Sequence, residues 1–176
     1  MEASTLWPQI RVDVERIMNA VVVEPTTTLS AYTYPIAALA WNLERGIQLE
    51  GILDALKNHP DLRDKDILLL TELDHGMARS GNRFVAKEIA DALGLNYAFA
   101  PVYIPLQKGS GVEAEMTGEN TLSIHGLAFF SRYPIRNAHA VALPNGKDKM
   151  QGKEKRLGWL RALVAEVEHP AGDFAR

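Results

Sequence analysis

Two polar residues, Asn42 and Glu72, each follow a run of apolar residues, and their side chains could together hold a divalent cation. Residues 36–41 and 67–70 are entirely apolar, which is typical of strands buried in a sheet. In open α/β sheets, functional side chains lie at the carboxyl ends of the strands, where the loops begin. One carboxylate and one amide, with waters completing the coordination shell, suit a hard cation such as Mg²⁺ or Mn²⁺.

The same two residues also have structural interpretations. Asn42 could cap the turn at Gly46, and Glu72 could form an ion pair with Arg79 or Arg83. Taken singly, each residue fits the structural role at least as well as the chemical one. The chemical interpretation depends on both residues ending neighbouring strands at the same edge of a sheet.

Two more candidates lie beside further apolar segments. Tyr103 ends the next predicted strand, where its hydroxyl could contact a phosphate or lie at the edge of the core. His125 precedes Gly126 at the start of another apolar segment, where it could line a cleft or occupy a turn.

The segment ARSGNR, residues 78–83, places Arg79, Asn82 and Arg83 around a turn that opens a predicted helix. Backbone N–H groups at a helix start favour anions, so these three residues could bind a substrate phosphate. The alternative is a capped helix start with solvated arginines.

Two more polar residues, Asp74 and His75, follow Glu72 after Leu73. Asp74 would share the face of Glu72 in an extended strand, because side chains alternate along a strand. His75 could serve as an acid or base, although an exposed loop histidine is the simpler interpretation.

The elements that position these residues follow from hydrophobic periodicity and chain breakers. Helices are predicted over residues 6–23, 48–57 and 82–93, and strands over residues 36–44, 67–71, 96–104, 127–131 and 160–167. The first of these strands is predicted to be buried on both faces. The charged segment 145–156 is predicted to be a solvated loop, or a flap that meets a phosphorylated substrate. The order of elements predicts an α/β fold, a mixed β-sheet with helices packed outside.

Composition limits the classes of function. The chain has 176 residues, enough for one domain with a core, and no apolar run long enough for stable insertion into a membrane. The absence of cysteine excludes disulfides and thiolate chemistry. Together with the lack of a membrane-spanning run and of a signal-peptide pattern, it favours the cytoplasm. A net charge of −3 argues against a protein that binds nucleic acid mainly through its overall charge, so a nucleic acid partner is possible but not favoured.

Three segments resemble landmarks of the endonuclease/exonuclease/phosphatase (DNase I-like) superfamily. They are WNLERG at 41–46, DILLLTELD at 66–74 and GLAFFSRYPI at 126–135. The resemblance implies a four-layer α/β sandwich, a phosphorylated substrate and Mg²⁺ or Mn²⁺ as cofactor. It implies that Glu72 binds the metal, and that Asn42 contacts the metal, a metal-bound water or the scissile phosphate.

The resemblance also divides the chain. It implies that residues 1–35 are an N-terminal helix and a connection, and that residues 36–176 are the N-terminal part of a truncated superfamily domain. The superfamily's later elements, which supply the general base, are not found before Arg176. The resemblance therefore implies a hydrolase of phosphodiesters or phosphomonoesters, of which this chain is the metal-binding half. It implies that the chain alone is inactive and that a missing C-terminal half completes the enzyme. The alternative is a catalytically inactive relative that acts as a binding or scaffold module, and a generic α/β domain ranks last.

Overall fold

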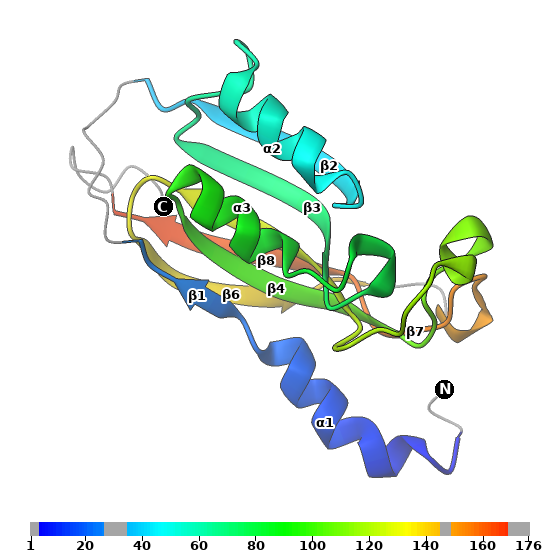
Figure 1. The fold of residues 1–176 in the computed structure, drawn as a ribbon. Helices are drawn as coiled ribbons and strands as arrows, with labels where there is room; N and C mark the ends of the chain where they lie inside the picture. Colours follow the sequence, from blue (N-terminus) through cyan, green and yellow to red (C-terminus); the bar gives the residue numbers. More distant parts are fainter. Residues whose placement is uncertain (1–3, 27–34, 145–148, 169–176) are drawn as a thin grey trace.

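A six-stranded mixed sheet carries the candidate residues, and helices α2 and α3 cover one of its faces (Figure 1). This computed structural model describes residues 4–26, 35–144 and 149–168. The elements are α1 (Trp7–Asn19), β1 (Val22–Glu24), β2 (Ala38–Arg45), α2 (Leu49–Asn58), β3 (Ile67–His75), η1 (Ala78–Ser80), α3 (Val85–Leu93), β4 (Asn96–Pro105), η2 (Gly111–Glu115), β5 (Ile124–Ser131), β6 (Ile135–Ala142), η3 (Lys149–Gln151), β7 (Arg156–Gly158) and β8 (Arg161–Val167).

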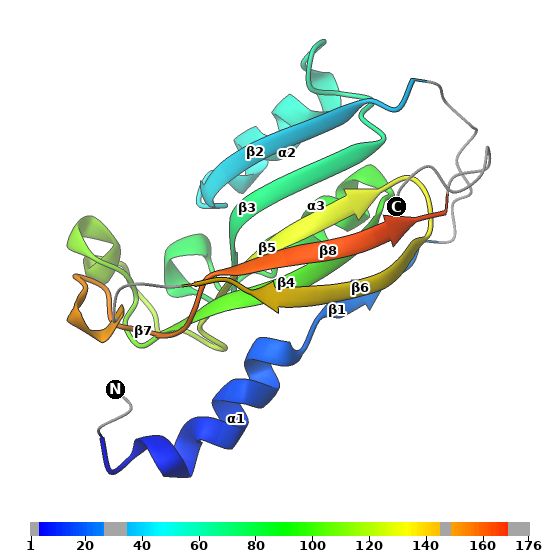
Figure 2. The same cartoon turned by 180° about the vertical axis from the view of Figure 1, so that it is seen from behind.

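The strand order is β1-β4-β5-β3-β2, with β7 paired to β4. Strands β2 and β3 run parallel, and the other pairs are antiparallel. A separate antiparallel pair, β6 and β8, lies against the face of β4 and β5 that the helices leave open (Figure 2). The predicted α/β fold, a mixed sheet with helices outside, is confirmed.

The main core lies between the two helices and the sheet. Leu49, Ile52 and Leu56 fall on one side of α2 at helical spacing, and each is buried. On α3 the equivalent positions are Val85 and Ile89, both fully buried. Nearly every residue of β4 is buried because this strand is covered on both faces.

Strand β2 differs from the prediction of a strand buried on both faces. It is an edge strand, and its alternate residues Ala38 and Ala40 are exposed. Leu69 of β3 lies on the same uncovered face with 44% of its surface exposed. Figure 2 shows that β6 and β8 do not extend over β2 and β3. Apolar sheet surface is therefore exposed beside the candidate site.

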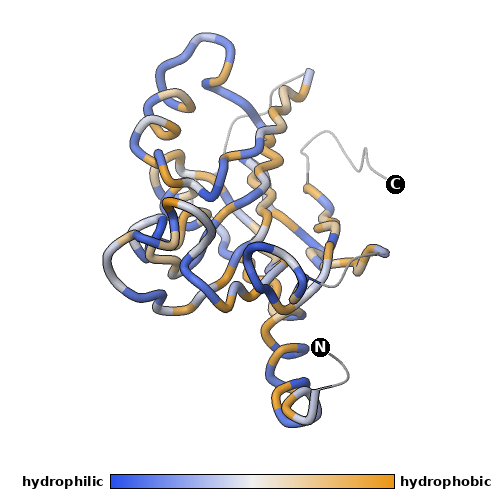
Figure 3. The backbone as a smooth tube through the Cα atoms, turned by 90° about the vertical axis from the view of Figure 1, so that its right-hand side faces the viewer, coloured by the Kyte–Doolittle hydropathy of each residue, from blue (hydrophilic) through white to orange (hydrophobic). Residues whose placement is uncertain are grey.

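The N-terminal segment does not stand apart from the sheet. The helix predicted over residues 6–23 ends at Asn19, and Val22–Glu24 instead form β1, which pairs with β4. Consecutive β-branched valines favour this strand over another helical turn. Figure 3 shows hydrophobic and hydrophilic residues alternating along α1, and this helix contacts β4 and β7. Much of the predicted connection, residues 27–34, lies outside the described residues.

Other element boundaries also differ from those predicted from the sequence. The third helix begins at Val85 rather than residue 82, after a short 3₁₀ turn, and β3 continues to His75. Strands β6 and β7 were not predicted. None of the helices in the described ranges is long and apolar enough to cross a bilayer.

Two glycine substitutions test the packing of the sheet. A Cβ on Gly126 in β5 would lie 2.4 Å from the backbone oxygen of Ala100 and 2.6 Å from the Phe99 ring. We expect Gly126→Ala to lower the free energy of unfolding by about 1–3 kcal/mol because this contact is overpacked. Gly51 in α2 has nothing within 4 Å of its Cβ position. As the control, Gly51→Ala should raise the free energy of unfolding by about 0.5–1 kcal/mol. Urea unfolding measures both, and an unchanged midpoint for Gly126→Ala would contradict the described packing.

Candidate functional site

Asn42 and Glu72 lie together at the carboxyl ends of β2 and β3. Because these strands are adjacent and parallel, their ends reach the same edge of the sheet. The side-chain amide of Asn42 donates a hydrogen bond from Nδ2 to Oε1 of Glu72 over 3.0 Å. Its Oδ1 accepts a hydrogen bond from the backbone N–H of Glu44, also over 3.0 Å. The proximity predicted from the sequence is therefore observed, and the backbone contact fixes which end of the amide faces Glu72.

A β-bulge places Glu72 at this edge. The pairing of β3 with β5 shifts between Thr71 and Leu73, so Glu72 is an additional residue on β3. Its φ angle is +58°, a left-handed conformation that glutamate rarely adopts. Non-glycine residues held in such a backbone conformation cluster at functional sites. Because of the bulge, Glu72 does not follow the regular alternation of side chains along β3. Its side chain lies at the solvent-exposed edge instead.

Arg45 is a third member of the site that the sequence interpretation missed. Its Nη1 lies 3.9 Å from Oε2 of Glu72, and its Nε lies 3.0 Å from Oε1 of Glu113. Arg45 belongs to the WNLERG segment, which was the available signal. Glu113 lies in η2, far along the chain, and nothing in its local sequence indicated this contact. The Glu72 carboxylate thus has an amide donor on one oxygen and a positive charge near the other.

Asp74 does not share the exposed face of Glu72, contrary to the prediction. The bulge changes the alternation, and Asp74 is fully buried. Its two oxygens accept hydrogen bonds from Nε and Nη2 of Arg79 at 2.7 and 3.0 Å, and Oδ1 lies 2.8 Å from Nδ1 of His125. Burial by itself raises the pKa of Asp74, but the hydrogen bonds from His125 and Arg79 outweigh it and lower the pKa.

Arg79 is buried, which corrects the predicted roles as a substrate ligand or a solvated arginine. Besides Asp74, its Nη1 contacts Glu154 at 2.8 Å and Glu113 at 3.3 Å. Burial by itself lowers the pKa of this guanidinium, but the hydrogen bonds and charges of the three carboxylates raise it overall. Arg79 therefore joins β3, η2 and the segment before β7. The segment 145–156 was predicted to be a solvated loop or a flap; Lys153 and Lys155 are exposed but Glu154 is buried, and residues 145–148 lie outside the described residues.

Asn82 and Arg83, the other two predicted substrate ligands, are engaged in internal contacts. Asn82 donates from Nδ2 to the backbone oxygen of Glu119 and accepts from the N–H of Thr121 through Oδ1. Arg83 forms ion pairs with Glu88 and Glu50. These contacts fix the loop before β5 and the start of α3, and they give both side chains a structural role.

His125 and Tyr103 lie on the same edge of the sheet but are buried. His125 is in β5 rather than in a turn, opposite Asp74 on one side and Tyr103 on the other. Burial raises the pKa of Tyr103, while the charge of Arg156, whose guanidinium lies 5.1 Å from the ring centre, opposes part of this shift. The structure therefore aligns the predicted catalytic residues across four adjacent strands, although only Asn42 and Glu72 reach the exposed side.

His75 is not an exposed loop residue, as the sequence interpretation preferred. It ends β3, is half-buried, and stacks on Phe84 with ring centres 3.7 Å apart and planes 5° apart. Burial lowers the pKa of His75 because the charged imidazolium is poorly solvated there.

Of the two predicted metal ligands, Glu72 is the one with a carboxylate that a cation could reach, because the amide oxygen of Asn42 already accepts a hydrogen bond from Glu44. Mg²⁺ commonly keeps several waters and takes one or two protein carboxylates. The side chain of Glu72 is 40% exposed, so a cation with its waters can approach the carboxylate. Among the described residues, no group of three or more acidic or histidine side chains could hold a metal ion. Glu72 would therefore be a single protein carboxylate on such an ion.

The chain matches no known family model, and a comparison with curated proteins finds no match.

The buried charges give a prediction for stability. We expect Arg79→Met to lower the free energy of unfolding by about 3–5 kcal/mol, because it leaves Asp74 and Glu154 buried without their cation. Arg83→Met is the matched control: its side chain is 32% exposed and its partner Glu50 is 80% exposed, so the loss should stay below about 1 kcal/mol. Urea unfolding of both variants measures the difference. Equal losses would contradict the buried network.

The half-buried ring of His75 makes the stability of the fold depend on pH. Because the pKa of His75 is lowered by folding, the unfolded chain binds more protons than the folded one as pH falls through the usual value of 6.5. The stability contributed by the neutral ring is then lost as pH falls toward the folded pKa. His75→Phe keeps an aromatic ring for the stack on Phe84 and should show a smaller loss of stability between about pH 7.5 and about pH 5. Urea midpoints across this range measure it, and identical pH profiles would contradict the assignment.

Proposed function

We propose that the chain is the metal-binding half of a divalent-metal-dependent phosphoesterase of the endonuclease/exonuclease/phosphatase superfamily. The observation that carries this proposal is the exposed Glu72 carboxylate, held in a left-handed bulge and hydrogen-bonded to Asn42 of the adjacent parallel strand. Support also comes from the three sequence segments that resemble the superfamily. Two of them form β2 and β3, and the third forms β5, which pairs with β3.

Each residue of the site has a distinct part in this proposal. Glu72 is the ligand of Mg²⁺ or Mn²⁺. Asn42 orients Glu72, because its amide nitrogen faces the carboxylate while its oxygen accepts from Glu44. Arg45 adds a positive charge that orients the second carboxylate oxygen. When bound, the metal neutralises the oxygens of a phosphate ester.

Tyr103 and His125 support the edge of the sheet in this proposal and take no part in the reaction. His125 is hydrogen-bonded to the buried Asp74, which also binds Arg79, and Tyr103 is covered by Arg156. The resemblance assigns the general base to the C-terminal half of a four-layer sandwich. We propose that this half covers the exposed face of β2 and β3, where Leu69 lies.

A metal-binding experiment tests the proposal. We expect the full chain to bind one Mn²⁺, and Glu72→Gln to weaken binding by about tenfold or more because it removes the negative charge of the proposed ligand. Asn42→Ala should weaken binding less, because it removes only the orienting hydrogen bond. Asp61→Asn, an exposed carboxylate between α2 and β3, is the control and should leave the affinity unchanged. Isothermal titration calorimetry measures all four proteins.

Hydrolysis of bis(p-nitrophenyl) phosphate separates the outcomes. Binding without efficient turnover is the expected result for the chain alone, since no described residue is assigned as the base. Robust turnover that Glu72→Ala abolishes would support the metal site and refute the predicted inactivity. The alternative of an inactive binding or scaffold module predicts binding without turnover even when the completing half is supplied. Absence of Mn²⁺ binding, or binding unaffected by Glu72→Gln, would refute the proposed function.

A further inference from the structure

A cavity of about 380 Å³ lies beside the candidate site, between the end of the edge strand β2 and the start of α2. We call it the β2 cavity. Asn42 is one of its lining residues and also donates the hydrogen bond to Glu72. The β2 cavity therefore begins one side chain away from the proposed metal ligand.

Four apolar residues form most of the lining of the β2 cavity: Trp41, Leu43, Ile47 and Ile52. Leu43 and Ile52 are buried, whereas Trp41 and Ile47 keep part of their surface exposed. Trp41 also packs against the main core, so this aromatic residue is held on a fixed strand. The lining is therefore suited to an apolar group that enters from solvent.

The turn between β2 and α2 forms one wall of the β2 cavity and is held in place by packing. Glu44 and Arg45 both have left-handed backbones, with φ angles of +46° and +71°, and Gly46 follows at +72°. A Cβ on Gly46 would lie 2.6 Å from the side chain of Val85 in α3, so glycine is needed for this close approach. Two consecutive non-glycine residues in this conformation cost energy, and such residues cluster at functional sites.

The charges around the β2 cavity do not favour a second anionic group. Among the described residues, Glu44 is the only charged one that lines it. The N-terminal end of α2 contributes roughly half a positive charge, which is less than the negative charge of Glu44. Arg45 does not line the β2 cavity, and its guanidinium contacts Glu72 and Glu113 instead. An uncharged group therefore suits this cavity better than a phosphate.

We propose that the β2 cavity binds the organic part of the substrate's phosphate ester, and that this part is apolar and uncharged. The inference rests on the proposed function and names its substrate class, an apolar ester such as an aryl phosphate rather than a polyphosphorylated compound. The organic group packs against Trp41 and Ile47, and the phosphate lies on the side of Asn42, toward the metal at Glu72. Aromatic side chains bury a large apolar area and pair well with a second ring. The volume lies in the range of pockets that hold small organic ligands.

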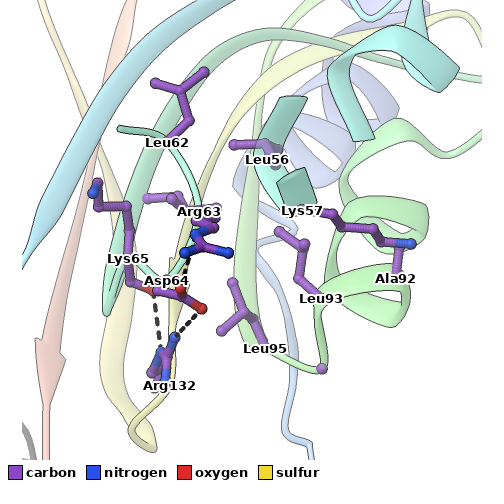
Figure 4. A pocket seen from close by; sticks show the side chains of 12 residues that line it. Leu56, Lys57, Leu62, Arg63, Asp64, Lys65, Ala92, Leu93, Leu95 and Arg132 are labelled. Carbon is purple, nitrogen blue, oxygen red and sulfur yellow. Dashed lines mark hydrogen bonds and ion pairs between the residues drawn. The ribbon is translucent and has the colours of Figure 1, made fainter. Parts of the chain in front are cut away.

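A larger cavity supplies the control for this proposal. It has a volume of about 440 Å³ and opens between the C-terminal ends of α2 and α3 (Figure 4). Leu68 lines it near the start of β3, four residues before Glu72, which is about 13 Å along a strand. Leu62, a partly exposed leucine of this larger cavity, can therefore be changed without touching the proposed site.

Titration calorimetry of the Mn²⁺-loaded full chain with phenyl phosphate and methyl phosphate tests the proposal. Both ligands offer the same phosphate group, and only the phenyl ring fills the β2 cavity, so we expect phenyl phosphate to bind about fivefold or more tightly than methyl phosphate. Ile47→Ser should weaken binding of phenyl phosphate by about threefold or more and leave methyl phosphate unchanged. Leu62→Ser makes a similar change in the larger cavity and should alter neither affinity. Circular dichroism verifies that both variants are folded.

The ligand comparison needs no variant and separates the possible outcomes. Glycerol 3-phosphate, whose organic part is polar, should bind like methyl phosphate. Failure of phenyl phosphate to bind, equal affinities for phenyl and methyl phosphate, or an equal effect of Ile47→Ser on both ligands would overturn the inference. Each of these results leaves the proposed metal site intact when Mn²⁺ itself binds. Absence of Mn²⁺ binding would instead refute the proposed function, and this inference with it, so the two failures are distinguishable.

Discussion

The additional residue in β3 sets the direction of every side chain that follows it. Without the bulge, Glu72 and Asp74 would lie on the same face of the strand. With the bulge, Glu72 lies at the exposed edge and is hydrogen-bonded to Asn42, while Asp74 is buried and binds Arg79. One local change of register thus separates two carboxylates into different environments. The left-handed backbone at Glu72 costs conformational energy, and the contacts on either side of the bulge offset that cost.

The buried cluster around Arg79 holds the other segments at this edge. An isolated buried charge costs several kcal/mol, so the guanidinium and its carboxylates are stable only as a complete set. The set joins β3 through Asp74, η2 through Glu113 and the segment before β7 through Glu154. Glu113 also contacts Arg45, which lies beside Glu72. A continuous series of ion pairs therefore links the exposed carboxylate to the buried cluster, and it restricts how Glu72 can move.

The sequence was enough to predict part of this arrangement. Two apolar runs that end in Asn42 and Glu72 predicted adjacent strands sharing an edge, and that adjacency is observed. The bulge could not be predicted, because a glutamate in a left-handed conformation has no local signature, and so the position of Asp74 was wrong. Arg79 was expected near solvent because arginine is seldom buried without partners. Its burial could not be predicted because two of its three carboxylate partners, Glu113 and Glu154, come from distant segments. Strand β6 was missed because its exposed alternate residues include apolar ones, which weakens the pattern.

We propose that the Glu72 carboxylate holds a divalent cation at the edge shared by β2 and β3. Crystals of the full chain soaked in Mn²⁺ and phosphate would test it through the anomalous scattering of manganese. We expect one anomalous peak within coordination distance of Glu72, with Asn42 still hydrogen-bonded to the carboxylate and phosphate density beside the ion. Anomalous density only elsewhere, or a Glu72 side chain that stays paired with Arg45 and without metal at saturating Mn²⁺, would contradict it.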